Sequence, residues 1–260
     1  MSHHDEEIFA DGNMTPVIRQ GILVRRALPA TWKITHALLQ HLALKNFDFA
    51  PRVVRKDESY EWLSFMPGQS LAADLAGNRS PDLLIQVGQM IAAYHRAVAD
   101  FVVPENSDWG PGFEENALPE VICHNDIAPW NTIVNADGRV TGLIDWDLIA
   151  PGPARWDLAY AAWRFGLLEP EDEFGSVAAR ANRITSLLDA YGLASAGRAG
   201  FIDLIRERAQ HGFDIVETLG KQGVPGFATL YEKGAHHWGK PSMNWIDQHR
   251  SELISIVESG

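Results

Sequence analysis

HNDIAPWN, residues 124–131, and DWD, residues 145–147, are the two stretches that decide how this chain folds. Each of them directly follows a short apolar run, the pattern of a buried strand. Between them lies NADGR, residues 135–139, whose Asn, Asp and Gly favour a tight turn. The pattern predicts short strands that fold back on one another, so that Asp145 returns toward Asn131.

The residue types in these stretches suit phosphoryl transfer. The reaction needs an acceptor hydroxyl aimed at a γ-phosphate and metal charge on the phosphate oxygens, and it needs little covalent help. A loop aspartate, Asp126, can accept the hydroxyl proton. Asn131, five residues later, and Asp145, at the end of the next hairpin, can hold a magnesium ion from two sides.

The first quarter of the chain predicts a small sheet that carries one helix. VIRQGILVRR, residues 17–26, alternates apolar and polar residues around a Gln-Gly turn and predicts a hairpin. Residues 31–42 place four aliphatic side chains on one helical face. Residues 51–66 predict a second hairpin, and Pro67-Gly68 ends it.

The rest of the chain predicts a mainly helical region. A Ser-Pro start signal precedes a predicted helix over 82–101, and residues 97–120 contain six acids and no Lys or Arg, which predicts an exposed acidic connector. Further helices are predicted at 155–166, 177–191, 199–219, 225–238 and 244–258. We therefore expect two domains, an N-terminal lobe at 1–66 that covers a nucleotide and a C-terminal lobe at 67–260 that carries catalysis and substrate binding.

The motifs H-x-D-x4-N and D-x-D resemble those of the aminoglycoside phosphotransferase and choline kinase family, which has a protein-kinase-like fold. GPARWDLA, residues 152–159, is similar to another segment of that family, and AYH at 93–95 is similar to the end of one of its helices. Together these features cover about residues 83–165. The resemblance implies an α+β, bilobal fold with a small N-terminal β-sheet lobe and a larger, mainly helical C-terminal lobe.

The resemblance also implies a site between the lobes for ATP and Mg2+. Asp126 would be the catalytic base, Asn131 and Asp145 would bind the metal, and Asp147 would lie at or behind it. His124 and Asp157 would be structural supports. The resemblance further implies that Arg25 takes the place of the usual strand-three lysine and that the backbone from Ser64 to Met66 meets adenine.

The N-terminal part departs from the family pattern. Its glycine-rich loop is reduced to Gly12 and Gly21, and residues 27–56 contain no Glu, so the sequence predicts that the usual Lys–Glu ion pair is missing. Either Arg25 or Arg26 could contact phosphates, with Thr35 or His36 near the helix position of the missing Glu. These departures leave open an alternative, a nucleotide-binding pseudokinase or regulatory module without turnover.

Composition limits the partners. With 34 acidic and 22 basic residues, the formal net charge of −12 argues against nucleic acid and anionic lipid and favours a cationic partner. Apolar runs of about 20 residues, the length of a membrane helix, are absent from the sequence, and Cys123 is its only cysteine. We expect a cytoplasmic enzyme whose acceptor is the hydroxyl of a small molecule, with aminoglycosides and amino alcohols as candidates.

The motif G-x4-G-K at 234–240 lacks the following Ser or Thr and is rejected as a phosphate-binding loop.

Overall fold

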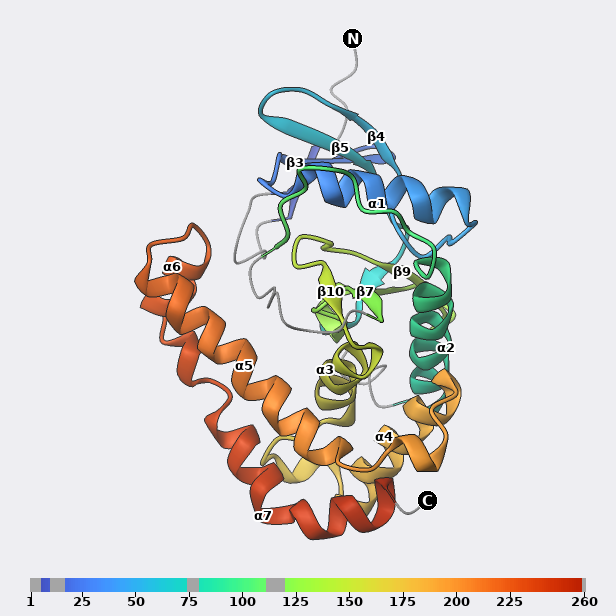
Figure 1. Ribbon diagram of the computed structural model, residues 1–260, viewed down its shortest axis with the longest axis vertical. Coiled ribbons are helices and arrows are strands. Elements are labelled where there is room, and N and C mark those ends of the chain that lie inside the picture. Colours follow the sequence, from blue (N-terminus) through green and yellow to red (C-terminus); the bar gives the residue numbers. More distant parts are fainter. Residues whose placement is uncertain (1–5, 10–16, 74–79, 111–119, 259–260) are drawn as a thin grey trace.

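Two parts of unequal size make up the chain in a computed structural model, which describes residues 6–9, 17–73, 80–110 and 120–258. Figure 1 shows a small sheet with one helix at the N-terminal end and a larger, mainly helical body beyond it. The predicted boundary at residue 66 falls between strands β5 and β6. Gly12 and the other residues outside these ranges are not described.

The N-terminal part is built on an antiparallel sheet of order β1-β2-β3-β5-β4. Its strands are β1 (Glu6–Phe9), β2 (Val17–Gln20), β3 (Leu23–Ala27), β4 (Val53–Lys56) and β5 (Tyr60–Ser64). Gly21 makes the turn between β2 and β3 with φ +64°, a conformation that glycine adopts at little cost. Both predicted hairpins are present, whereas β1 was not predicted. The register sets Arg26 opposite Glu61.

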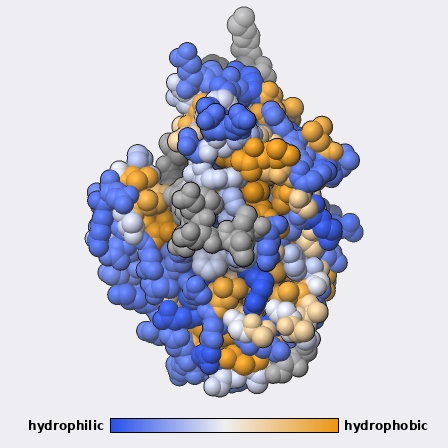
Figure 2. All heavy atoms as spheres, viewed as in Figure 1, coloured by the Kyte–Doolittle hydropathy of each residue, from blue (hydrophilic) through white to orange (hydrophobic). Residues whose placement is uncertain are grey.

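Helix α1 (Trp32–Leu44) joins this sheet to the rest of the molecule. Its predicted apolar face is fully buried and belongs to one hydrophobic cluster that continues into the larger part. The loop after α2 (Pro81–Ala97) supports the other end of α1, since Lys45 is paired with Asp100 at 2.5 Å. Figure 2 shows apolar residues gathered where this loop runs along α1, and mostly hydrophilic residues over α5 and α6.

Gly68 fixes the path between the two parts. Its φ is +135°, and a Cβ added there would collide with the carbonyl oxygen of Val134. This close approach allows β6 (Gln69–Ser70) to pair with β8 (Thr132–Val134), which in turn pairs with β9 (Val140–Leu143). The segment that follows the N-terminal sheet is therefore attached to the hairpin that ends near Asp145.

The larger part combines two small sheets with helices. β7 (Val121–Cys123) pairs with β10 (Ala150–Gly152), a strand that was not predicted. The helices after β10 are α3 (Ala154–Gly166), α4 (Val177–Tyr191), α5 (Phe201–Lys221), α6 (Phe227–Glu232) and α7 (Lys240–Val257). The single helix predicted at 225–238 is wrong in its extent: α6 ends early, and Gly234, with φ +77°, opens a separate 3-10 turn. None of the helices in the described ranges combines the length and apolarity that a membrane span requires.

Candidate active site

The segment after β7 forms the candidate catalytic loop. Asn125 has φ +67°, a left-handed conformation that costs energy for a residue with a side chain. The Asn125 amide stabilises this turn by donating a hydrogen bond to the carbonyl of Leu148 at 2.8 Å. The turn projects the next residue, Asp126, out of the end of the strand.

Asp157, on the first turn of α3, holds the loop from behind. Its fully buried carboxylate accepts hydrogen bonds from the backbone N–H groups of His124 (2.7 Å) and Asn125 (2.8 Å) and lies 3.2 Å from Nε2 of His95. Burial alone would raise the pKa of Asp157, but the hydrogen bond and charge of His95 and the other donors lower it. An ionised carboxylate therefore fixes the start of the loop.

The carboxylate of Asp126 is surrounded by donors. Oδ2 accepts from Nδ2 of Asn131 at 2.7 Å and from Nε1 of Trp130 at 3.1 Å. The Tyr160 side chain of α3 also hydrogen-bonds to Asp126, and burial followed by the Asp126 charge raises the pKa of Tyr160, so its hydroxyl stays protonated. Tyr160 and Trp130 are two groups beside Asp126 that the sequence did not single out.

Asp145 and Asp147 bring two more carboxylates to this loop. Asp145 has φ +65°, so the chain bends sharply just after β9. Its surroundings disfavour charge: desolvation, then Asp147 and to a lesser degree Asp126 raise the pKa of Asp145, while Arg26 opposes the shift. Half of the Asp145 side chain is exposed, so solvent screens part of this repulsion. Crowded acids of this kind suit a site for a divalent cation.

The donors fit Mg2+ shared with a nucleotide. In the described parts of the chain, His, Cys, Asp and Glu side chains do not form a group of three that could hold a metal alone. Magnesium bound with phosphates, however, takes only one or two protein oxygens and completes its shell with phosphate and water. Asn131 donates through Nδ2 to Asp126, which leaves its amide oxygen to act as an acceptor.

A buried network connects these acids to the N-terminal sheet. Arg26 on β3 donates from Nη1 and Nη2 to both carboxylate oxygens of Asp147, at 2.9 and 2.6 Å, and from Nε to Glu61 at 2.6 Å. Its Nη1 also lies 3.7 Å from Asp145. Although burial opposes its charge, Asp147, Glu61 and Asp145 raise the pKa of Arg26. One guanidinium thus joins the two parts of the molecule.

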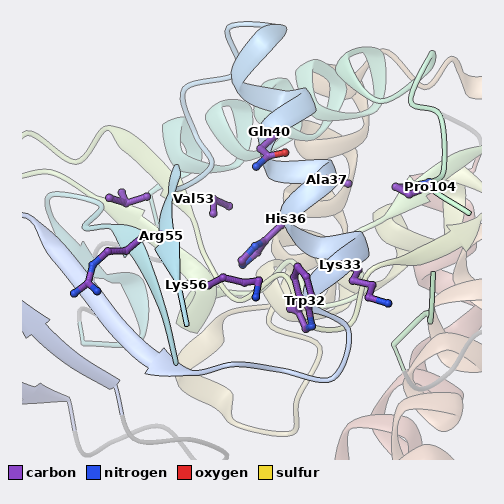
Figure 3. A pocket seen from close by; sticks show the side chains of 10 residues that line it. Trp32, Lys33, His36, Ala37, Gln40, Val53, Arg55, Lys56 and Pro104 are labelled. Atoms are coloured by element: carbon purple, nitrogen blue, oxygen red, sulfur yellow. The ribbon is translucent and has the colours of Figure 1, made fainter. Parts of the chain in front are cut away.

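Glu61 carries the network on to α1. Its side chain is fully buried, and Oε2 lies 2.5 Å from Nε2 of His36. Burial favours the neutral acid, but His36 and Arg26 outweigh it and lower the pKa of Glu61. His36 also lines a pocket of about 540 Å3 between α1 and β4. Figure 3 shows it there together with Trp32 and Lys56.

Comparison with known proteins identifies this arrangement. The sequence pattern of the phosphotransferase enzyme family matches residues 111–193, which include the catalytic loop, Asp145 and Asp157. Trifolitoxin immunity protein of Rhizobium leguminosarum bv. trifolii is 36% identical, in an alignment that covers 98% of this chain and 99% of that protein. The chain belongs to the phosphotransferase enzyme family.

Solved structures place this phosphotransferase in the kinase-like fold. An amicoumacin kinase in complex with AMP-PNP and Ca2+ has a TM-score of 0.63 and 11% identity, with 95% of this chain and 90% of the other covered. A choline/ethanolamine kinase family protein of Mesorhizobium loti has a TM-score of 0.59 and 14% identity, with 94% and 92% covered. At such identities the likeness shows the fold alone, and it confirms the predicted bilobal α+β class.

The structure corrects one predicted position in the N-terminal part of the phosphotransferase. Arg25, expected in the place of the strand-three lysine, lies 5.1 Å over the Tyr60 ring, whereas Arg26 faces the acids. Neighbouring residues of a strand point to opposite faces, so only one of the two arginines can face inward. An ion pair that was not predicted takes the place of the usual Lys–Glu pair, because Arg26 pairs with Glu61 of β5 and not with a helical Glu.

The segment predicted to meet adenine lies at the junction of the two parts. The Ser64 hydroxyl accepts a hydrogen bond from the backbone N–H of Arg52 at 2.8 Å. The Met66 side chain packs so closely on Gly142 of β9 that a Cβ on that glycine would come within 2.9 Å of it. Contact of Ser64 and Met66 with a nucleotide stays a prediction.

Three further residues near the candidate site of the phosphotransferase escaped the sequence analysis. Glu61 belongs to a predicted strand. The only hint of its role in the sequence is that this acidic residue stands between aromatic and apolar residues. Arg164 on α3 contacts the Trp130 and Tyr160 rings beside Asp126, and Arg208 on α5 reaches Tyr160 because α3 and α5 pack together. Helix spacing could not show this, since neither arginine belongs to a motif.

Proposed function

We propose that this phosphotransferase is a small-molecule kinase that moves the γ-phosphoryl group of ATP to a hydroxyl of its acceptor, with Mg2+ as cofactor. The observation that carries the proposal is the convergence of Asp126, Asn131 and Asp145 at one place, with Asp126 and Asn131 joined by a 2.7 Å hydrogen bond. These are the three groups that phosphoryl transfer to an alcohol requires.

Each residue has a distinct part in the proposed reaction. Asp126 accepts the proton of the acceptor hydroxyl, and the donors around its carboxylate fix its orientation. Asn131 and Asp145 hold the metal, whose charge stabilises the phosphate oxygens. Arg26 holds Asp147 beside the metal site and takes the place of the family's lysine toward the phosphates. The backbone from Ser64 to Met66 meets the adenine ring.

The relatives suggest a role for the reaction. One relative bears the name of a trifolitoxin immunity protein, and several proteins with the same fold are named as kinases that act on antibiotics. We propose that phosphorylation by this chain inactivates a toxic small molecule, and aminoglycoside-type and amino-alcohol-type acceptors remain candidates. Unchanged drug and toxin susceptibility of cells that overproduce the protein would count against this role.

A pseudokinase is the second candidate. The observation that favours it is the engagement of Arg26 with Asp147, because a guanidinium bound to two carboxylate oxygens is already satisfied before a nucleotide arrives. Such a protein would bind Mg2+ and ATP without turnover.

One experiment separates the two candidates. Consumption of ATP is measured with Mg2+ over a panel of aminoglycosides, amino alcohols, sugars and nucleosides, for the natural protein and for Asp126→Asn. The kinase proposal predicts turnover that depends on an acceptor and falls by about 10²- to 10⁴-fold in the variant. Retained ATP binding in the variant, measured by calorimetry, shows that the loss concerns chemistry. ATP binding by the natural protein with no turnover on any acceptor would favour the pseudokinase.

A further inference from the structure

The part of the site where an acceptor would approach Asp126 contains arginine side chains, which do not suit a polycation. If the proposed function holds, the acceptor hydroxyl must reach the Asp126 carboxylate. Oδ2 of this carboxylate accepts from Asn131 at 2.7 Å and from the Trp130 indole at 3.1 Å, and the Tyr160 hydroxyl lies beside the same carboxylate. An acceptor hydroxyl that reaches Asp126 would therefore lie next to these two rings.

Arg164 lies against the same two rings. Its guanidinium carbon is 4.9 Å from the Trp130 ring centroid and 5.5 Å from that of Tyr160. Its Nε is buried and makes no hydrogen bond, and Glu169 is 3.9 Å from Nη1, beyond the distance of a strong charge-assisted bond. The guanidinium also stacks 3.4 Å over the Trp163 ring, and the side chain retains 19% exposure, so a ligand would have to approach its terminal nitrogens and not the buried Nε.

Arg208 adds a second positive charge from α5. It is only 4% exposed, and its guanidinium stacks 4.5 Å from the Tyr160 ring centroid. Nη2 donates to the carbonyl of Asn125 at 2.7 Å, while Nε is buried without a partner. In the described part of the chain no carboxylate forms an ion pair with Arg208. Two guanidinium groups therefore border Tyr160, and the carboxylates nearest to them are Glu169 for Arg164 and the buried Asp157 and Asp126 for Arg208.

These charges decide which acceptors the site favours. An ammonium group placed beside Trp130 and Tyr160 would meet two guanidinium groups in a partly dehydrated site, where repulsion is strong. A carboxylate there could accept two parallel N–H bonds from Arg164. The Trp130 ring is 39% exposed and offers a flat apolar surface for a planar group.

We propose that the acceptor is a hydroxyl compound that carries a carboxylate or comparable anionic group, paired with Arg164, and a planar ring or unsaturated segment, packed on Trp130. The net charge of −12 does not describe this part of the surface. Arg164 is then a specificity-determining residue, and the buried Arg208 adds a second positive charge beside Tyr160.

Matched ligands test this proposal, which rests on the proposed function but has its own measurement. Indole-3-lactate, its primary amide and the amine tryptophanol share an indole and a hydroxyl and differ in charge. Their binding is measured by saturation-transfer NMR, without nucleotide and with Mg2+ and ATP. We expect the acid to bind at least about tenfold more tightly than the amide, equivalent to about 1.4 kcal/mol, and the amine to bind most weakly.

The variant Arg164→Gln should lower the affinity for the acid to that for the amide and leave the affinity for the amide unchanged. Arg206→Gln is the control, because Arg206 lies on α5 and pairs with Asp247 at the surface. Tightest binding of the amine, equal losses for acid and amide, or no binding of the acid by a protein that binds Mg2+ and ATP would each overturn the proposal. Failure to bind or consume ATP would instead refute the kinase function, because the charge preference is measured without nucleotide as well.

Discussion

Nη2 of Arg26 lies 2.6 Å from Oδ1 of Asp147, across the junction between the N-terminal sheet and the segment that follows β9. The same guanidinium bonds to the buried carboxylate of Glu61. Arg26 is therefore both a structural link and a neighbour of the proposed metal site.

Replacement of Arg26 by Ala should destabilise the protein strongly, because it leaves Glu61 buried without its cation. We expect a loss of about 3–5 kcal/mol in the free energy of unfolding, measured with a chemical denaturant. Arg25→Ala is the matched control on the next residue, and it removes only a contact with the Tyr60 ring worth about 0.5–1 kcal/mol. Equal losses for the two variants would show that the inward position of Arg26 is unimportant.

Asp145→Asn should have opposite effects on the protein alone and on its complex with Mg2+ and ATP. It removes repulsion from Asp147 and Asp126, and since half of the side chain is exposed we expect a gain of only about 1 kcal/mol without metal. The increase in melting temperature caused by Mg2+ and ATP should fall in the same variant. Thermal unfolding with and without Mg2+ checks both effects, and undiminished stabilisation by Mg2+ and ATP would remove Asp145 from the metal site.

Asp157 should contribute a stability that depends on pH. Its folded-state pKa lies below the unfolded value, so the contribution is fully present above the unfolded pKa of about 4 and is lost as the pH falls through the folded pKa. Asp157→Asn should cost about 3–5 kcal/mol near neutral pH. Denaturant unfolding between pH 3 and 7 should show a flatter acid dependence for the variant, and parallel curves for both proteins would contradict this account.

Gly68→Ala should destabilise the junction between the two parts. The added Cβ would collide with the Val134 carbonyl, and the φ of +135° is unfavourable for any residue with a side chain. We expect a loss of about 1–3 kcal/mol. Gly138→Ala is a useful comparison, because Gly138 also has positive φ but its Cβ would meet open space. A loss no larger for Gly68 than for Gly138 would show that the close approach to β8 contributes nothing.

Much of this protein could be predicted from short stretches of sequence. The spacing from Asp126 to Asn131 and on to Asp145 lies within a single hairpin unit, so local strand and turn preferences bring these residues together. The helical periodicity of α1, α3, α4 and α7 depends in the same way on neighbours three and four positions apart. The fold class followed from the resemblance that these local motifs carry, together with the small sheet and the helices that the same local signals predict.

The remaining contacts of the site depend on how strands and helices far apart in sequence pack together. Which arginine faces Asp147 depends on the phase of β3 against β5, and a shift of one residue would exchange Arg25 for Arg26. The pairing of Glu61 with His36, and the approach of Arg164 and Arg208 to Asp126, join residues that are far apart in sequence. Such contacts are fixed by strand register and helix packing, whereas local strand and turn preferences are enough to set the geometry of the β8–β9 hairpin.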